Sequence, residues 1–269
     1  MLVILSGNSG AGKNTVISEI LKSENDYGLL PTFTTREKRD NEKQGDPYCF
    51  ITEDAFKSML ENDLLYEHQI IHNHYYGVGK EKLSELSKQY KILIKDIDVL
   101  GTLSMLKTVS KEIDVLTFFL KVPVNELIRR LKLRGETDIE LRLKRCDMEN
   151  ELACYYDYIL ENTDLQTTVN LIKTIVSYEL NNNYLLPTIK ADALSKESVI
   201  RLIASAASSL VTGKIDNLDQ FCFPSVKAAV VNANVYIIEG HHEYLASKLS
   251  GTHIAKEIVS SDIDVSEDF

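Results

Sequence analysis

Tryptophan is absent from this chain of 269 residues, and cysteine is scarce. The four cysteines, Cys49, Cys146, Cys154 and Cys222, form no C-x-x-C pair and have no metal-like spacing with histidine. This pattern argues against a zinc site or a disulfide framework. We expect scattered, reduced core thiols in a cytoplasmic protein.

Long hydrophobic runs and excess positive charge are also missing. No apolar run approaches about 18 residues, so no transmembrane helix is expected. The apolar N-terminus runs directly into a glycine-rich segment, which favours a first strand and not a signal peptide. The formal charge is −10, which argues against broad binding to nucleic acid or anionic membranes. The basic residues are instead concentrated at 36–43 and 129–145.

A glycine-rich segment follows the apolar run 2–5, and residues 7–15 read G-N-S-G-A-G-K-N-T. A buried strand, a glycine turn and a helix in this order are typical of a phosphate-binding loop. Its backbone N–H groups and helix N-terminus would hold a polyphosphate, and Lys13 would reach the β- and γ-phosphates. A glycine-rich turn without a ligand is the alternative. The predicted ATP contacts are Gly7, Asn8, Ser9, Gly10, Ala11, Gly12, Lys13, Asn14 and Thr15.

The loop departs from G-x-x-x-x-G-K-[ST] at its last position, where Asn14 stands and Thr15 follows. The hydroxyl of this motif normally ligates Mg²⁺, so we assign that contact to Thr15. Asp96 lies at the end of a buried apolar run and is expected to support the same ion.

Apolar runs of strand length alternate with helix-like segments up to about residue 180, which predicts an α/β fold with a largely parallel sheet. Strands are expected at 2–6, 48–51, 64–71, 91–97, 114–121 and 157–161. Helices are expected at 13–23, 53–61, 80–89, 98–109, 123–133, 138–153 and 164–180. A polar, turn-prone stretch then predicts a linker at 181–187.

A basic, turn-rich segment precedes the second predicted strand. Arg36 and Arg39 are three residues apart, so both guanidinium groups can face one phosphate, and Tyr48 adds a hydroxyl donor. A solvated charged loop is the alternative interpretation.

The same segment, residues 34–50, matches T-T-R-x-x-R-x-x-E-x-x-G-x-x-Y-x-F and thereby resembles the nucleoside-monophosphate-binding signature of guanylate kinases. The resemblance implies that Arg36, Arg39 and Tyr48 hold the phosphate of the acceptor. It also implies that Glu42 orders the arginines and that Thr32 lies near the guanine carbonyl.

Three further segments resemble this family. The runs L-Y-E and H-Y-Y-G resemble its F-I-E and N-Y-Y-G-[ST] segments, and residues 95–101 resemble its L-D-I-D-x-Q-G strand end. The resemblance implies that Glu67 and Asp98 read the base and that Tyr76 binds phosphate. Guanine has an N1–H donor that adenine lacks, so facing carboxylates would select guanine. A capping or surface acid is the alternative for either residue. Val78 and Leu100 depart from the family's hydroxyl residue and glutamine.

Residues 129–145 carry many basic side chains and resemble the family's lid, R-L-x-x-R-G-x-x-x-x-E-x-x-x-x-R. The resemblance implies that Arg134 and Arg145 close on the transferring phosphoryl group and act with Lys13 as catalytic residues, with Arg130 as a further contributor. Phosphoryl transfer depends on charge stabilisation more than on a covalent catalyst, which suits this composition. The other basic residues of the run are expected to be solvated.

Residues 188–269 are predicted to form a second, small α/β domain. Its expected elements are a strand near 187–190, a helix at 195–211, a strand at 235–239 and a helix at 242–250. The segment G-H-H-E within it resembles G-H-H-R of the ParB/sulfiredoxin-like fold, but Glu243 replaces the arginine and would repel phosphate. We assign no role to this domain.

The guanylate kinase resemblance covers residues 1–180. It implies the P-loop nucleoside-monophosphate-kinase fold, a parallel sheet flanked by helices with acceptor-binding and lid subdomains. The implied activity is ATP-dependent phosphorylation of GMP or dGMP with Mg²⁺. A non-catalytic guanylate-kinase-like binding module and a kinase of altered acceptor specificity are the alternatives. The expected partners are these nucleotides, without nucleic acid or membrane, and a homodimer is left open.

Overall fold

The computed structural model describes most of the chain as two compact units. The first unit is formed by the described residues of Met1–Ser6 and Lys13–Leu116, and the second by Gly7–Gly12 and the described residues from Thr117 onward. The described residues are 1–39, 42–71, 73–110, 112–136, 138–181, 226–231, 234–239 and 254–260.

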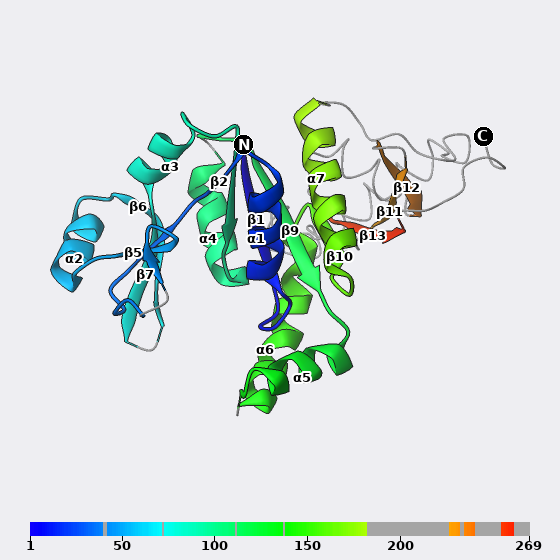
Figure 1. Cartoon of the computed structure of the whole chain (residues 1–269), viewed down its shortest axis with the longest axis horizontal. Helices are drawn as coiled ribbons and strands as arrows, with labels where there is room; N and C mark the ends of the chain where they lie inside the picture. Colours follow the sequence, from blue (N-terminus) through cyan, green and yellow to red (C-terminus); the bar gives the residue numbers. More distant parts are fainter. Residues whose placement is uncertain are drawn as a thin grey trace, which may run out of the picture. The chain divides into compact units, whose positions relative to one another are not determined.

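Three parallel strands lie at the centre of the first unit: β1 (Leu2–Gly7), β8 (Ile92–Asp96) and β2 (Tyr27–Leu29), with β8 in the middle. Their nearly continuous apolar runs fit parallel strands that are covered on both faces. Helices α1 (Lys13–Ser23) and α4 (Val99–Val109) accompany these strands (Figure 1). Leu2, Leu93 and Met105 are buried in one core cluster. The carboxyl ends of β1 and β8 therefore lead into the glycine loop and Asp96.

A mixed sheet in the same unit carries the predicted acceptor residues. Its strand order is β4 (Lys43–Gln44), β5 (Pro47–Phe50), β3 (Thr32–Thr34), β7 (His74–Gly79) and β6 (Leu65–Ile71). Strand β3 pairs in parallel with β5 and antiparallel with β7, and β7 forms a hairpin with β6. Helix α2 (Glu53–Glu61) begins after the N-cap Thr52, and α3 (Lys80–Leu86) follows β7.

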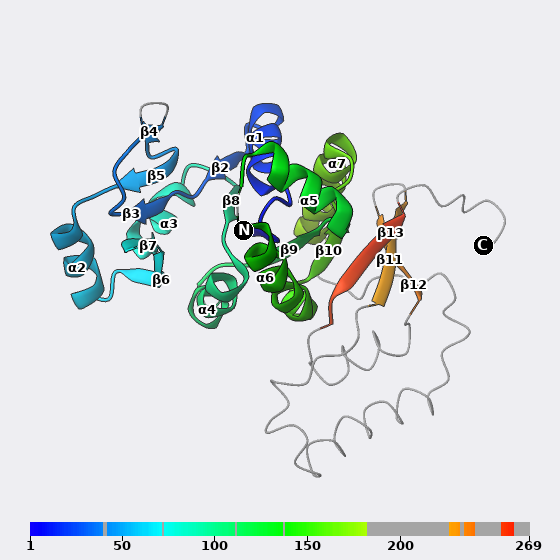
Figure 2. The same ribbon diagram turned by 90° about the horizontal axis from the view of Figure 1, so that it is seen from below.

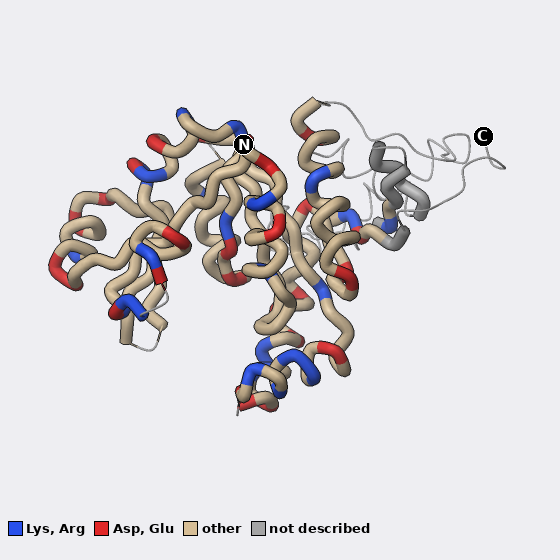
Figure 3. Tube along the Cα trace, in the orientation of Figure 1, with Lys and Arg blue, Asp and Glu red and all other residues tan. Residues whose placement is uncertain are grey.

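The second unit is built on another row of strands. Their spatial order is β9 (Val115–Lys121), β10 (Tyr158–Glu161), β13 (Lys256–Ser260), β11 (Val226–Val231) and β12 (Asn234–Glu239). The β11–β12 pair is antiparallel, and the pairs β9–β10, β10–β13 and β11–β13 are parallel (Figure 2). The helices of this unit are α5 (Val124–Leu133), α6 (Ile139–Glu151) and α7 (Leu165–Asn181), with a 3₁₀ turn at Leu152–Tyr155. Basic residues, with acidic ones among them, gather on α5 and α6 (Figure 3).

The predicted helices and strands up to residue 181 are confirmed, with ends that shift by a few residues. The sequence pattern does not predict β2, β3, β4, β7, β11 or β13, most of which are short or are defined by their pairing partners. Strand β12 matches the strand expected at 235–239. The strand expected near 187–190 and the helices at 195–211 and 242–250 lie outside the described residues. Among the described helices, none is long and apolar enough to cross a membrane.

Strand β13 extends the row of strands beyond β10. The Lys256 amide donates to the carbonyl of Asp157 (2.9 Å), and the Lys256 ammonium lies 4.4 Å from the centre of the Tyr158 ring. The next residue of β13, Glu257, forms an ion pair with Lys121 of β9 (3.6 Å). Residues near the C-terminus therefore cover the edge that β10 would otherwise expose.

Candidate active site

The glycine loop between β1 and α1 has the backbone that phosphate binding requires. Gly7, Gly10 and Gly12 have φ angles of +135°, +92° and +89°, which side-chain-bearing residues rarely adopt. A Cβ atom on Gly7 would lie 2.3 Å from the carbonyl oxygen of Leu120. These positions therefore need glycine for both conformation and space.

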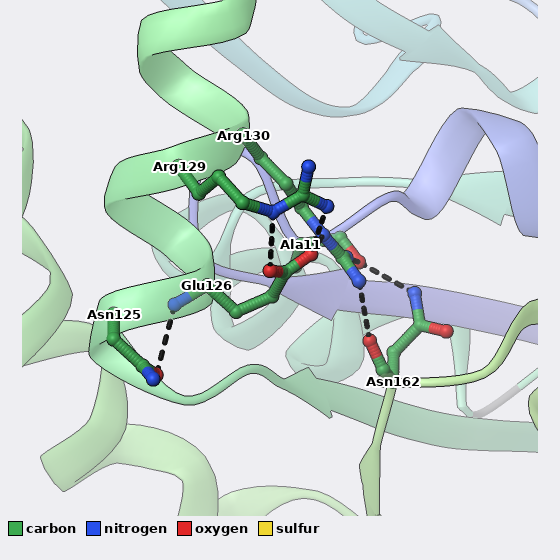
Figure 4. Close-up of polar contacts among 6 residues, drawn as sticks. All are labelled: Ala11, Asn125, Glu126, Arg129, Arg130 and Asn162. Atoms are coloured by element: carbon green, nitrogen blue, oxygen red, sulfur yellow. Dashed lines mark hydrogen bonds and ion pairs between the residues drawn. The ribbon is translucent and has the colours of Figure 1, made fainter.

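Arg130 of α5 helps to hold this loop in place (Figure 4). Its guanidinium group donates to the carbonyl oxygens of Ala11 (3.4 Å) and Asn162 (3.0 Å). The Asn162 side-chain amide also donates to the carbonyl of Ala11 (2.6 Å). Glu126 accepts hydrogen bonds from Arg129 and Arg130, which lower the pKa of its carboxyl group to about 2. The hydrogen bonds of Arg130 therefore stabilise the conformation of the loop.

Helix α6 contacts the same loop through two polar side chains. Arg142 donates to the Ser9 hydroxyl (2.7 Å) and to Glu136 (2.6 Å). The side chain of Asn8 donates to the buried carboxylate of Glu149 (3.2 Å). Two successive residues of the loop are thus attached to α6.

The two predicted lid arginines differ in their surroundings. Arg145 lies on α6 and pairs with Glu149 (2.8 Å), so it is linked to the loop through that carboxylate. Arg134 is exposed at the C-cap of α5. Both residues are exposed, which is typical of groups that contact their ligand only after closure.

Lys13, Asn14 and Thr15 are the first residues of α1 in the first unit. Asn14 and Asp96 line a cavity of about 410 Å³, together with Asp46 and Pro47. Asn14 and Thr15 are both exposed on the helix, and Asn14 shares the cavity with Asp96. Carboxylate and amide oxygens of this kind suit Mg²⁺, which in kinases takes one or two protein ligands and completes its shell with phosphate and water.

The predicted phosphate ligands of the acceptor are organised by Glu42. Arg36 donates two hydrogen bonds to its carboxylate, at 2.7 and 2.9 Å. The backbone amide of Arg39 donates to the same group (2.9 Å). These bonds, led by those from Arg36, lower the pKa of Glu42 to about 2. Arg39 itself is exposed.

Two tyrosines accompany the arginine pair. The Arg36 guanidinium lies 5.2 Å from the centre of the Tyr48 ring, and the Tyr48 and Tyr76 rings are 6.2 Å apart in an edge-on arrangement. Burial is the main cause of a raised pKa at Tyr48, with Asp96 adding to it. The Tyr48 hydroxyl therefore stays protonated and able to donate at neutral pH.

The predicted base-reading carboxylates occupy two different settings. Glu67 is buried on β6, beside an irregularity in the β6–β7 pairing and opposite Val78. Asp98 caps α4, accepting from the Gly101 amide (2.7 Å) and from Gln69 (3.0 Å). Burial, reinforced by the charge of Asp98, raises the pKa of Glu67 to about 7. The capping role of Asp98 is therefore observed, and its predicted base contact would come in addition.

The model of the guanylate kinase family matches residues 1–179. The guanylate kinase of Carboxydothermus hydrogenoformans is 36% identical over 182 residues, which cover 66% of this chain and 88% of that protein. The guanylate kinase of Rickettsia typhi is 34% identical over 188 residues, covering 68% and 94%. The chain belongs to the guanylate kinase family.

The fold agrees with this assignment. A crystal structure of guanylate kinase from Anaplasma phagocytophilum superimposes with a TM-score of 0.51 at 24% identity, covering 68% of this chain and 87% of that one. The expected P-loop fold, a parallel sheet flanked by helices, is thereby confirmed for the kinase part. As a guanylate kinase family member, the chain is a nucleoside monophosphate kinase. The ParB/sulfiredoxin-like resemblance of the C-terminal segment stays a prediction.

Several residues of this guanylate kinase site were not singled out by the sequence. Arg142, expected to be a solvated charge, contacts Ser9 of the glycine loop. Asn162 and Glu149 hold the backbone or side chains of the loop from distant positions. Lys95, in the apolar strand β8, lies buried beside Thr32. The spacing of Arg142 and Arg145 on one helix hinted at the first of these, whereas the others depend on tertiary contacts.

Proposed function

We propose that this guanylate kinase family member transfers the γ-phosphoryl group of ATP to the phosphate of GMP or dGMP. One observation carries the choice of acceptor. The mixed sheet and its loop hold a phosphate clamp, Arg36 oriented by Glu42, and the same sheet holds the buried carboxylate of Glu67. A purine with N–H donors on its pairing edge and a phosphate on its sugar satisfies both features.

The donor nucleotide is assigned to the glycine loop and Lys13. Backbone N–H groups at the start of α1 suit the β- and γ-phosphates, and the Lys13 ammonium offsets their charge. We assign Arg134 and Arg145 to the equatorial oxygens of the phosphoryl group in transfer, where charge is spread in the transition state.

Arg36, Arg39, Tyr48 and Tyr76 are assigned to the acceptor phosphate. They would neutralise it and hold one of its oxygens in line with the γ-phosphorus. That oxygen forms the new P–O bond as the bond to ADP breaks, so no covalent enzyme intermediate is required. Thr32, Glu67 and Asp98 are assigned to the base.

Mg²⁺ is proposed as the accompanying ion, which would offset phosphate charge when bound with ATP. Asp96 and Asn14 offer oxygen atoms in one cavity, and Thr15 is the neighbouring hydroxyl. Among the described residues, no cluster of three or more His, Cys, Asp or Glu side chains could hold a metal by itself. The ion would therefore depend on the nucleotide for most of its ligands.

A kinase of altered acceptor specificity is the second candidate. It is favoured by Val78, a buried apolar residue opposite Glu67, where the family resemblance leads one to expect a hydroxyl. The two candidates share the phosphate-binding residues and differ only in the base.

The test is ADP formation from ATP and Mg²⁺ by the full chain, with GMP, dGMP, AMP, CMP and UMP offered separately. We expect turnover with GMP or dGMP and a loss of about 10²- to 10³-fold in Lys13→Ala and Arg39→Ala. Lys57→Ala is the matched control, because Lys57 is an exposed cation paired with Glu53 on α2. Turnover with a different acceptor would favour the second candidate, and no turnover would favour a non-catalytic binding module.

We further propose a cytoplasmic location and small nucleotides as the physiological partners. The location is supported by the cysteines: of those described, Cys49 and Cys146 are buried and Cys154 is half-buried, all with free thiols.

A further inference from the structure

A buried lysine lies in the part of the first unit assigned to the base. Lys95 is on β8, and 1% of its surface is exposed. Lysine is almost never fully buried without a partner. Its ammonium group donates to the Thr32 hydroxyl (2.5 Å) and, at 3.4 Å, to the Leu30 carbonyl. Removing this charge from water costs free energy, so its burial is expected to serve a purpose other than packing.

The chemistry of the ammonium group dictates how Thr32 is oriented. An ammonium has three N–H donors and no acceptor, so the Thr32 oxygen must accept from it. The Thr32 hydroxyl hydrogen is therefore directed to a different acceptor. Lys95 itself retains an N–H beyond the two that Leu30 and Thr32 accept in the described part of the chain. Together the two residues form a donor group.

Carboxylates stand beside this donor group. The charge of Glu67 acts on Lys95, and Gln69 connects Glu67 to Asp98 through its amide. Burial lowers the pKa of Lys95, whereas Asp96 and Glu67 raise it. Hydrogen-bond donors thus come from Thr32 on β3 and Lys95 on β8. The acceptors are the carboxylates of Glu67 on β6 and Asp98 at the start of α4.

This order of donors and acceptors matches one purine edge. Guanine presents the O6 acceptor next to the N1–H and N2–H donors, whereas adenine presents an amino donor at position 6 and a bare N1. Val78, opposite Glu67, has no hydroxyl with which to contact O6.

We propose that Lys95 determines base specificity by donating a hydrogen bond to the 6-carbonyl of the acceptor guanine, beside Thr32. The proposal rests on the proposed function and names the residue that replaces the hydroxyl absent at position 78. An ammonium placed there attracts a carbonyl oxygen and repels the amino group of adenine, so it contributes to both selection and rejection.

The test compares GMP with 6-thio-GMP, which keeps N1–H and N2–H but offers sulfur, a weaker acceptor, at position 6. The wild-type protein is expected to prefer GMP. Lys95→Met is expected to raise the KM for GMP about 10- to 100-fold, as for loss of a charged hydrogen bond, with a smaller change in kcat. It should also bring the GMP to 6-thio-GMP ratio of kcat/KM close to one. A ratio unchanged from wild type would overturn the proposal.

Two further variants separate a direct contact from an effect through Thr32. In a Thr32→Ala background, a direct contact predicts that Lys95→Met still lowers the ratio, and no further change would overturn it. Adding Val78→Ser to Lys95→Met restores a hydroxyl donor and is expected to recover part of the preference for GMP. Thermal melting of each variant checks that it is folded at the assay temperature, and Lys95→Leu, which also removes the ammonium group, replaces Lys95→Met if the latter is not.

Failure of the proposed function is distinguishable from failure of this proposal. If the wild-type chain shows no turnover, calorimetric titration with GMP and 6-thio-GMP measures the same ratio as binding constants. Tighter binding of GMP that depends on Lys95 supports the inference without kinase activity. Turnover of GMP with a ratio independent of Lys95 supports the proposed function and overturns the inference.

Discussion

Glu67 and Glu42 are the same type of residue in the same unit, but their carboxyl groups have very different pKa values. Glu42 receives hydrogen bonds from Arg36 and Arg39, led by those from Arg36, and its pKa is about 2. Glu67 is buried, and its pKa is about 7 against an ordinary value of 4.5. The folded state therefore holds a proton on Glu67 that the unfolded chain releases above pH 4.5. The stability that this proton contributes is present below that pH and is lost as the pH rises to about 7.

Acceptor affinity is expected to follow the charge of Glu67. Only the carboxylate accepts well from guanine N1–H, so the KM for GMP should rise roughly tenfold from pH 8 to pH 6. The check is a pH profile of KM. Glu67→Gln should have a higher KM at pH 8 and a flatter profile, and this comparison removes the titration of the GMP phosphate itself. Parallel profiles in the two proteins would contradict the assignment of Glu67.

At the scale of elements, the glycine loop takes its shape from structures that follow it in the chain. Its Ala11 carbonyl accepts from Asn162, after β10, and from Arg130 on α5. Asn8 and Ser9 are attached to α6. The conformation of the loop therefore depends on long-range contacts, whereas its glycines are required by the local backbone angles.

Asn162→Ala should weaken ATP binding more than GMP binding. The substitution removes the 2.6 Å bond to Ala11 and leaves that carbonyl with the longer bond from Arg130. We expect a loss of about 1–3 kcal/mol in the free energy of unfolding and a several-fold higher KM for ATP. Urea denaturation and KM values for both nucleotides are the measurements. Asn170→Ala, an exposed change on α7, is the control, and an equal rise in both KM values would argue against a loop-specific role.

At the scale of the whole molecule, the C-terminal residues join the strands of the kinase part. Strand β13 pairs with β10 from Tyr158 to Leu160, and Ile258 is buried on it. The residues that cover this edge are separated from β10 by about a hundred positions in the chain. The linker at 181–187 and the separate domain at 188–269 stay predictions.

Ile258→Ala should therefore destabilise the protein without altering its chemistry. Truncating a buried isoleucine costs about 2–5 kcal/mol where the site is well packed. The measurement is the free energy of unfolding from urea denaturation, with kcat and KM unchanged. Glu257→Gln, which alters a partly exposed ion pair on the same strand, should cost under about 1 kcal/mol. An Ile258→Ala variant as stable as wild type would mean that β13 unfolds independently.

The amino-acid sequence by itself determined the helices and the longer apolar strands up to residue 181, the phosphate-binding loop and the acceptor signature. Their signals are local: apolar periodicity, glycine where φ is positive, and basic residues at fixed spacing. The apolar run that predicts β8 also gave no sign that Lys95 within it has a polar partner.

Only the tertiary structure decided which of these local features act together. It placed Thr32 against Lys95, Glu42 between the arginines, Arg142 on Ser9 and Asn162 on Ala11. It also defined β3 and β7, which are strands because of the partners they pair with, and it added β13 beside β10. Hydrogen bonds between residues far apart in the chain leave no periodic trace in the sequence, because their partners are chosen by the fold and not by spacing.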